Sequence, residues 1–450
     1  MTPSARPPRA DFLLVHAGQL LTLPGGPASR RGPAARDLGV IEDGAFACSD
    51  GRVIWAGSTD EASAFSGPDV RIVDAGGRLV MPGFVDPHTH PVFVGLREME
   101  FALRASGATY QQIAEAGGGI ASTVRTTRSA SRAELAASLH DHLSDMLRFG
   151  TTTLEAKSGY SLDRDGEIES LELLAEAALN GPQTIVPTFL GPHAVPPEFE
   201  GRPDDFIAFM IDEVLPVVSS RKLAKYADIF CERNVFDPAQ SARFLEAAMT
   251  AGLGVRIHAD EFSAFGGAEL AASLGAASAD HLLMASDEGV AALAASDTTA
   301  VLLPATAFFL GLAFPDGRRF LDAGAAVALA TDFNPGSCYC PSMPFVLSTA
   351  VCRCRFTVEE AIVAATANSA ACLGLGGVKG TLQPGADADF TIWDLDDYRG
   401  IPYHLAAPDI VSVHCSSMPA WTKDDRSYPV QPARDRGRIC MDESGWKAGR

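Results

Sequence analysis

The sequence contains no uninterrupted apolar run of the roughly 18 residues that a membrane-spanning helix needs. It also lacks basic residues relative to acidic ones: 36 Lys and Arg stand against 56 Asp and Glu, a formal charge of −20. Such a field repels nucleic-acid phosphates and anionic lipid surfaces. No small-residue cleavage signature follows the basic, Pro-rich start. These absences predict no nucleic-acid partner, no membrane partner and a cytoplasmic location.

The sequence also lacks the paired cysteine spacing of a disulfide framework. Its nine cysteines are an odd number spread over a long chain, which is typical of a reducing compartment. Two CxC pairs are formed by Cys338, Cys340, Cys352 and Cys354. Their spacing is shorter than the about two to four intervening residues of common zinc sites. Thiols without a metal are therefore the favoured interpretation of these pairs.

A chain of 450 residues with 47% hydrophobic content can bury a large core. Between about residues 80 and 373, short β-like runs alternate with amphipathic helical stretches. Eight such units predict an α/β fold, a (β/α)8 TIM-like barrel whose active site lies at the carboxyl ends of its strands. The strand-like runs are LVMPGFVD, TTTLEA, TIVPTFL, ADIFC, GVRI, ASAD, TTAVLLP and AVALAT.

The two ends of the chain have a different pattern. Short alternating runs such as RVIWAG and DFTIWDL are broken by Gly and Asp, which is typical of strands joined by turns. We expect the ends to pair as one small flanking β-sandwich domain, with the barrel inserted between its halves. The predicted boundaries are 1–79 and 376–450 for the two halves of the small domain and 80–375 for the barrel.

Two His–X–His pairs occur in contrasting contexts. His88 and His90 follow an apolar strand, and because side chains alternate along a strand, both imidazoles face the same side. That geometry suits two ligands of one ion. His140 and His142 lie in the helical stretch SRAELAASLHDHLSDML, where two residues turn the chain by about 200°. We expect these two rings to point apart as helix-surface residues and not as ligands.

Further polar side chains come directly after predicted strands. His193, His258 and His281 do so, and barrel side chains at these positions converge on one mouth. Asp332 ends the eighth strand, which adjoins the first around a closed barrel and lies beside His88. Imidazole and carboxylate groups suit zinc or iron(II), and an open position on such an ion would admit water.

Glu261 lies three residues after His258 in the segment HADE. It is a candidate proton shuttle because it can reach water at the metal without binding the ion. The alternative is a carboxylate that orients a ligand histidine. His281 can polarise a carbonyl or move protons, and its alternative role is a structural hydrogen bond.

Several stretches together resemble the amidohydrolase superfamily, and within it the enzymes that open an imidazolone ring in histidine degradation. They are PGFVDPHTHPVF, EFALR, GGGIASTVR, FGTTTLEAKSGY, HADEF, ATDFNPGS and IPYH. The resemblance covers most of residues 80–375. It implies hydrolysis of a C–N bond in a small anionic imidazolone substrate. It also implies one divalent metal ion, Zn²⁺ or Fe²⁺/Fe³⁺, held by His88, His90, His258 and Asp332.

The same resemblance implies roles for further residues. Catalytic roles fall on Glu261, His281 and Asp332. Substrate contacts fall on Arg97, Tyr160, His193, Glu261, Asn334, Gly336 and Ser337. Physical chemistry supports one of these assignments directly, because a guanidinium in the loop after the first strand can bind a propionate carboxylate through two hydrogen bonds. The alternative for Arg97 is a surface charge.

Lys157 raises the question of a second metal, because some related hydrolases use a carboxylated lysine to bridge two ions. Lys157 follows the second predicted strand and not the fourth. We therefore expect a single metal, with Lys157 as a structural or substrate-side cation. The sequence after SVHC departs from the usual family ending, which leaves the last strand of the small domain open. A homodimer is a further expectation, since such barrels often form symmetric dimers.

Two other functions remain open from the residues alone. A deaminase of a cyclic substrate such as a purine or pyrimidine would begin with the same attack by activated water, but it would release ammonia. A noncatalytic barrel that serves as a binding or scaffold module is the other alternative, since fold does not determine function. The complete set of candidate ligands together with Glu261 and Arg97 favours an enzyme.

Overall fold

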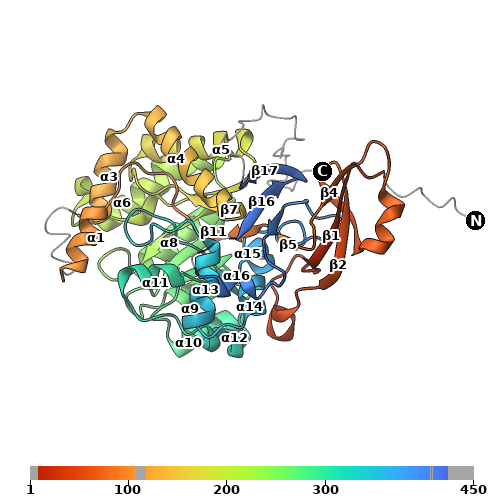
Figure 1. Cartoon of the computed structure of the whole chain (residues 1–450). Coiled ribbons are helices and arrows are strands. Elements are labelled where there is room, and N and C mark those ends of the chain that lie inside the picture. Colours follow the sequence, from red (N-terminus) through yellow and green to blue (C-terminus); the bar gives the residue numbers. More distant parts are fainter. Residues whose placement is uncertain (1–8, 108–117, 406, 408, 424–450) are drawn as a thin grey trace, which may run out of the picture.

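The computed structural model describes residues 9–107, 118–405, 407 and 409–423 (Figure 1). One of its sheets is parallel, with strand order β14–β13–β12–β11–β9–β8–β7–β6 and β10 beside β11. The bounds are β6 (Phe84–Asp86), β7 (Thr151–Lys157), β8 (Thr184–Phe189), β9 (Tyr226–Ala227), β10 (Phe230–Cys231), β11 (Gly254–Ala259), β12 (Ser278–His281), β13 (Thr299–Leu302) and β14 (Val327–Leu329). Because β9 and β10 share the run ADIFC, these strands occupy the eight predicted positions, and the barrel fold is confirmed.

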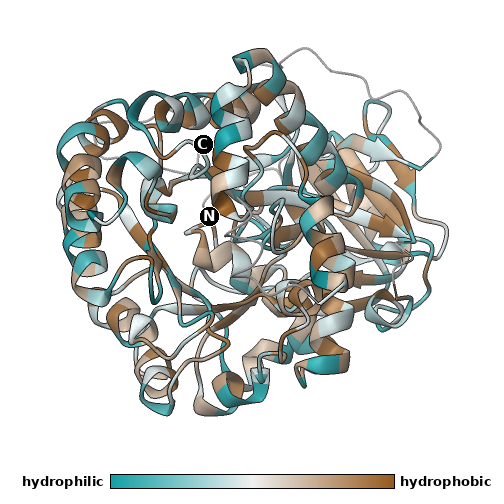
Figure 2. Ribbon diagram, turned by 90° about the vertical axis from the view of Figure 1, so that its left-hand side faces the viewer, coloured by the Kyte–Doolittle hydropathy of each residue, from teal (hydrophilic) through white to brown (hydrophobic). Residues whose placement is uncertain are grey.

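Helices surround this sheet on the outside, as Figure 2 shows. They are α1 (Glu98–Ala105), α3 (Ile120–Ser129), α4 (Arg132–Arg148), α5 (Arg164–Asn180), α6 (Pro203–Phe209), α7 (Leu215–Ser220), α8 (Pro238–Thr250), α9 (Gly267–Leu274), α10 (Asp287–Ala294), α11 (Pro304–Leu310), α12 (Gly317–Ala323), α13 (Met343–Arg353), α14 (Val358–Ala364), α15 (Ala367–Cys372) and α16 (Gly400–Tyr403). Among the described residues, no helix combines the length and the apolar character required to cross a bilayer.

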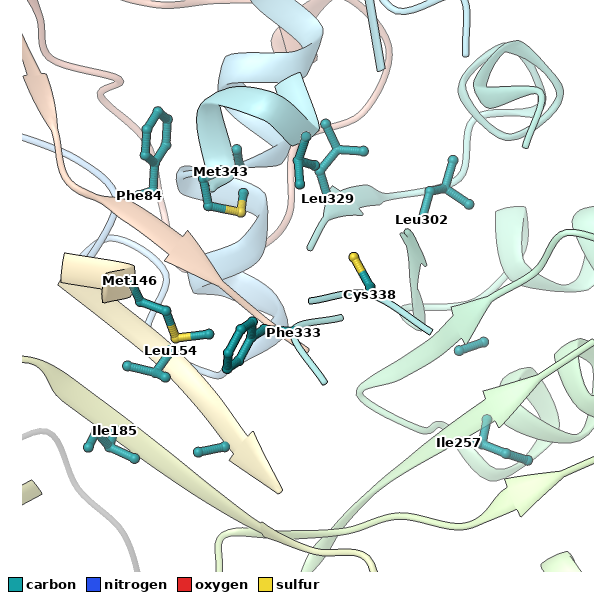
Figure 3. Packing of buried hydrophobic residues seen from close by; sticks show 14 of the residues in the cluster. Phe84, Met146, Leu154, Ile185, Ile257, Leu302, Leu329, Phe333, Cys338 and Met343 are labelled. Carbon is teal, nitrogen blue, oxygen red and sulfur yellow. The ribbon is translucent and has the colours of Figure 1, made fainter. Parts of the chain in front are cut away.

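The ring closes just beyond the ends of β6 and β14. Thr89 and Phe333 form a parallel bridge, the Phe333 carbonyl accepts from the His90 amide at 2.9 Å, and the His88 carbonyl accepts from the Asp332 amide at 3.1 Å. Closure therefore occurs at the level of the predicted ligands. On the outer face of the ring, apolar side chains of the strands pack against the helices, among them Leu154 beside Met146 of α4 in Figure 3.

Capping residues mark the starts of two helices. Ser131 and Glu134 form a capping box at α4, and Asp237 and Gln240 form another at α8. One prediction on α4 is wrong. His140 is exposed as expected, but His142 is buried, with Nδ1 2.9 Å from the Pro91 carbonyl and its ring stacked on Phe93. The inner face of α4 packs under the segment that follows β6, so this ring lies inside the protein.

Strands from both ends of the chain form the second sheet, in which red and blue arrows lie side by side in Figure 1. It is mixed, with order β17–β16–β15–β5–β1–β2–β3 and β4 beside β1. Phe12, Phe46 and Phe390 pack at its centre with ring centroids 5.1–5.9 Å apart. The bounds are β1 (Phe12–Leu21), β2 (Val40–Ser49), β3 (Arg52–Ser58), β4 (Arg71–Asp74), β5 (Leu79–Pro82), β15 (Phe390–Trp393), β16 (Ile410–Cys415) and β17 (Met418–Thr422).

The run LVMPGFVD, taken from the sequence as one barrel strand, is divided between the two sheets. Its first half is β5, which pairs with β15, and its second half is β6. Gly83 separates them: a Cβ there would lie 2.2 Å from Thr152 Oγ1. A side chain at this crossing between the sheets would therefore require Thr152 to move. β17 pairs with β16, so the second sheet does have a strand after SVHC.

Candidate metal centre and substrate pocket

Four predicted ligand side chains converge where the ring closes. His90 Nε2 lies 3.2 Å from His88 Nε2 and 3.4 Å from His258 Nε2. Asp332 Oδ1 lies 3.4 Å from the Nε2 atoms of both His88 and His90. These four side chains are at most 3% exposed. Residues from three barrel strands are thus brought to one point, although the chain separates them widely.

The donor set fits a metal ion. Tetrahedral ligands with bonds of about 2.0–2.1 Å stand about 3.3 Å apart, which is close to the separations observed here. Lone pairs of imidazoles facing each other at this distance repel unless a cation lies between them. His88 Nδ1 is 2.7 Å from Asp280 Oδ2, and His258 Nδ1 is 3.0 Å from Asp228 Oδ2. Asp280 thus holds the proton on Nδ1 of His88 and leaves its Nε2 available as a ligand, and Asp228 places a negative charge beside Nδ1 of His258.

The second oxygen of Asp332 is held by its own partners. Thr306 Oγ1 donates to Oδ2 at 2.8 Å, and Ser337 Oγ lies 3.4 Å from the same atom. Sequence reasoning missed Thr306. It stands in the first turn of α11, directly after the seventh barrel strand, so the rule that barrel function gathers after the strands could have found it.

His281 adjoins the same centre. Its ligand atom lies within 4.8 Å of those of His88 and His258, so these three residues form a second candidate grouping. Backbone strain marks the position, because φ is +79° at His281 and +52° at Asp332. Non-glycine residues in this left-handed region are costly, and they concentrate at functional sites. Both residues stand at carboxyl ends of strands.

A buried ionic cluster lies one layer deeper in the barrel. Lys157 Nζ is 2.6 Å from Glu155 Oε1 and 2.8 Å from Asp228 Oδ2. Arg256, two residues before His258 on β11, lies 3.6 Å from Asp280. Burial lowers the pKa of Lys157, but Asp228 and Glu155 reverse this effect and raise it. Lys157 is therefore a structural cation that supports the carboxylates behind the histidines.

Glu261 and His281 face one another at the rim, with Oε1 and Nδ1 3.6 Å apart. Burial raises the pKa of Glu261 well above its usual range, and the charges of Asp332 and Glu232 add to the shift. The loop is held from below, because Glu232 accepts hydrogen bonds from the amides of Phe262 and Ser263. Burial thus favours the protonated form of this carboxyl group more than water would.

His193 and Tyr160 pack beside the cluster. The His193 ring stacks on His90 with centroids 5.1 Å apart, and its Nδ1 is 2.8 Å from the Gly159 carbonyl. The Tyr160 ring lies 5.2 Å from that of His193. Burial, with a further contribution from His258, lowers the pKa of His193 to about 3, so this imidazole is neutral.

A tight turn follows Asp332. Asn334 Oδ1 accepts from the amides of Gly336 and Ser337 at 2.8 and 2.7 Å, and its Nδ2 donates to the Asp332 carbonyl. The guanidinium of Arg97 lies across Gly336, where a Cβ would be 2.0 Å from Nη1. The turn therefore links the ligand carboxylate to the predicted anion-binding arginine.

One cysteine of the CxC pairs, Cys338, closes the turn after Asp332, because its carbonyl accepts from the Asn334 amide at 2.9 Å. Cys338 and Cys354 are buried and Cys352 is exposed, all with free thiols. The groups of candidate metal ligands found among the described residues contain histidine and aspartate and no cysteine.

Comparison with known proteins agrees with this geometry. Residues 79–431 match the model of the amidohydrolase family. An imidazolonepropionase from Bacillus cytotoxicus is 45% identical over 93% of this chain and 98% of its own length. One from Symbiobacterium thermophilum is 47% identical over 90% of this chain and 95% of its own.

A zinc-bound adenosine deaminase from Xanthomonas campestris has a TM-score of 0.67 at 18% identity, covering 92% of this chain and 94% of that one. This likeness shows the fold alone.

A barrel with a histidine and aspartate cluster at the carboxyl ends of its strands is the architecture of a metal-dependent hydrolase, and the chain belongs to the amidohydrolase family. Within that family, its identity of 45–47% over nearly the full length groups it with the imidazolonepropionases.

Proposed function

We propose that this chain hydrolyses 4-imidazolone-5-propanoate to N-formimino-L-glutamate. The observation that carries the proposal is the convergence of four side chains in a chain of this family. His90 Nε2 lies 3.2 Å from His88 and 3.4 Å from His258, and Asp332 Oδ1 lies 3.4 Å from both His88 and His90. These four residues would hold one divalent ion, Zn²⁺ or Fe²⁺/Fe³⁺. Such an ion supplies water with a pKa lowered toward about 7.

The reaction consumes one water. Its oxygen bonds to the ring carbonyl carbon, the C–N bond of that carbonyl breaks, and the released nitrogen takes up a proton. Glu261 is the proposed carrier of that proton: it would accept a proton from the attacking water and pass it to the leaving nitrogen. Burial favours the protonated form of its carboxyl group, which suits the holding of the proton between these two steps.

His281 is the proposed polarising group. Burial lowers its pKa to about 3, so the ring is neutral and can donate one hydrogen bond to the carbonyl oxygen as negative charge develops there. Its strained backbone holds it at the rim next to Glu261.

The propionate side chain of the substrate defines the rest of the pocket. Arg97 would bind its carboxylate, and the rings of Tyr160 and His193 would flank the imidazolone. Asn334, Gly336 and Ser337 would form the wall that separates the ring from Arg97. This arrangement offsets a protein charge of −20 with a local cation where the anion must bind.

The test is a turnover assay of the purified protein on 4-imidazolone-5-propanoate, with formimino-glutamate and ammonia measured in parallel. We expect stoichiometric formimino-glutamate and no ammonia. Ammonia release from a purine or pyrimidine, without imidazolone turnover, would instead establish a deaminase.

Elemental analysis of protein prepared without added metal tests the ion, and we expect one equivalent of zinc or iron per chain. We also propose a homodimer, which sedimentation of the same sample tests.

A further inference from the structure

Glu100 in the first turn of α1 binds Arg97 through two hydrogen bonds. Arg97 Nε and Nη2 both donate to Oε2 of Glu100, at 3.0 and 2.7 Å. The other oxygen, Oε1, accepts from the amide of Gly119 at the start of α3, at 3.1 Å. The two side chains are 10% and 13% exposed, so this ion pair is largely removed from water.

The contact leaves the working edge of the guanidinium available. Arginine has five N–H donors, of which Glu100 takes two on one edge. The terminal edge, formed by Nη1 and Nη2, is the one that can bind a carboxylate through two parallel bonds. Nη1 is also the atom that lies against Gly336. Burial raises the pKa of Tyr160, and the charge of Arg97 opposes part of this increase. The guanidinium therefore also acts on Tyr160, another residue proposed to contact the substrate.

The Gly336 side of the pocket is tied to the same helix. Arg104, one turn after Glu100, donates from Nη1 to the Gly336 carbonyl at 3.2 Å and stacks on Phe309. Helix α1 therefore holds both the arginine, through Glu100, and the turn against which that arginine lies.

We propose that Glu100 is a positioning residue for substrate binding: it fixes the Arg97 guanidinium so that its terminal edge meets the substrate carboxylate. The inference rests on the proposed function, which assigns that carboxylate to Arg97. A contrary role is that Glu100 occupies Arg97 in place of the substrate and must be displaced. The Gly119 amide opposes displacement, because it anchors the second oxygen of Glu100.

Two effects of removing Glu100 have opposite signs. Loss of orientation weakens carboxylate binding, whereas loss of a negative charge near Arg97 strengthens the attraction for an anion. Glu100→Asp separates them, because it keeps the charge and shortens the reach. Glu100→Gln keeps the reach and removes the charge. If Glu100 positions Arg97, shortening its side chain should raise KM for the anionic substrate more than removing its charge does.

The experiment measures kcat and KM for the full-length, metal-loaded protein and its variants. The substrates are imidazolonepropionate and its neutral propionamide counterpart. We expect Glu100→Ala and Glu100→Asp to raise KM for the anion about tenfold while kcat changes by less than about threefold, and Glu100→Gln to raise it less. KM for the propionamide should stay within about twofold of wild type. In an Arg97→Ala background, Glu100→Ala should add nothing.

Several results would contradict a positioning role of Glu100. A lower KM in Glu100→Ala would identify Glu100 as a competitor of the substrate and overturn the proposal. An unchanged KM, or a full additional loss in the Arg97→Ala background, would overturn it as well. If Arg97→Ala itself leaves KM for the anion unchanged, Arg97 does not bind the substrate carboxylate. That result would contradict the proposed function's assignment of Arg97, independently of Glu100.

Thermal unfolding and metal content serve as folding controls. A variant that loses turnover of both substrates together with its metal or its thermal stability is misfolded. In that case KM for the anionic substrate is measured in Glu100→Gln, which keeps the side-chain length, and a raised KM supports the proposal whereas an unchanged KM contradicts it.

Discussion

Two segments of this molecule share the spacing His–X–His and have different structures. After β6, His88 and His90 bring their Nε2 atoms to 3.2 Å. On α4, His140 is exposed and His142 is buried against Phe93, so the rings lie on different faces of the helix. The backbone period explains the contrast: two residues restore the same face in an extended chain and turn it by about 200° in a helix. Spacing therefore indicates a site only together with the secondary structure around it.

The largest expected effect comes from removing one histidine of the pair after β6, compared with removing one histidine of the pair on α4. His90→Ala removes a ligand, and we expect loss of the bound ion and a fall in kcat/KM of at least about 10³-fold. His140→Ala, with the same chemical change in the helical pair, should keep one equivalent of metal and wild-type turnover. Metal analysis and steady-state kinetics on both proteins check this. Retention of tightly bound metal by His90→Ala would show that the cluster is not the metal site.

The second effect distinguishes a residue that moves a proton, Glu261, from a residue that binds the ion, His90. Glu261→Gln keeps the shape of the side chain but cannot carry a proton, so we expect kcat to fall about 10²–10⁴-fold. Metal content should stay at the wild-type level, unlike that of His90→Ala. Glu246→Gln, on the exposed face of α8, is the matched control. Wild-type turnover in Glu261→Gln would remove this residue from the mechanism.

The third effect compares two buried lysines, one in the barrel and one beside the second sheet. Lys157 lies between Glu155 and Asp228 in the barrel, and Lys379 lies 2.6 Å from Asp389 beside the small sheet. Replacing either by Met leaves buried carboxylates without a counter-charge and should cost about 3–5 kcal/mol of unfolding free energy. Urea unfolding of the metal-free proteins measures this loss.

Only Lys157→Met should also weaken metal binding, by about 10–100-fold, because Asp228 supports His258. Competition with a chelator tests that difference. Equal metal affinity in Lys157→Met and Lys379→Met would disconnect the ionic cluster from the metal centre.

The smallest effect concerns a buried histidine far from the metal site. His414 stacks on Phe390 in the small sheet, and burial, helped by Arg71, lowers its pKa to about 3. The unfolded chain takes up this proton near pH 6.5, whereas the folded chain does not until about pH 3. The stabilisation from the neutral ring is thus complete above pH 6.5 and declines as the pH falls toward 3.

His414→Gln should therefore reduce the slope of unfolding free energy against pH by up to about 1.4 kcal/mol per pH unit below 6.5. Urea unfolding at several pH values between 7.5 and 5 measures the slope, which is insensitive to a constant loss of stability from the substitution. Identical slopes in the two proteins would contradict the assignment.

Much of the fold and of the candidate site could be predicted from local signals. The strands before His88, His258 and Asp332 are short apolar runs, and the barrel rule places whatever follows them at one mouth. The helix starts at Ser131 and Asp237 are equally local. These predictions needed only the periods of strand and helix and the chemistry of capping residues.

Other features had no local signal. The division of LVMPGFVD at Gly83 depends on Thr152, a residue of a neighbouring strand. The burial of His142 depends on what packs over α4. Sequence reasoning also missed Asp280, although it stands next to His281, because its role is visible only once it lies 2.7 Å from His88, 192 positions earlier in the chain.

The sequence by itself determined the kinds of side chain that follow each strand, and with them the chemistry this protein can perform. Only the tertiary structure decided which of those side chains meet, which carboxylate supports which histidine, and which edge of Arg97 is left for a ligand. The physical reason is range: backbone periodicity acts over a few residues, whereas ligand geometry arises when strands far apart in the chain close into a ring.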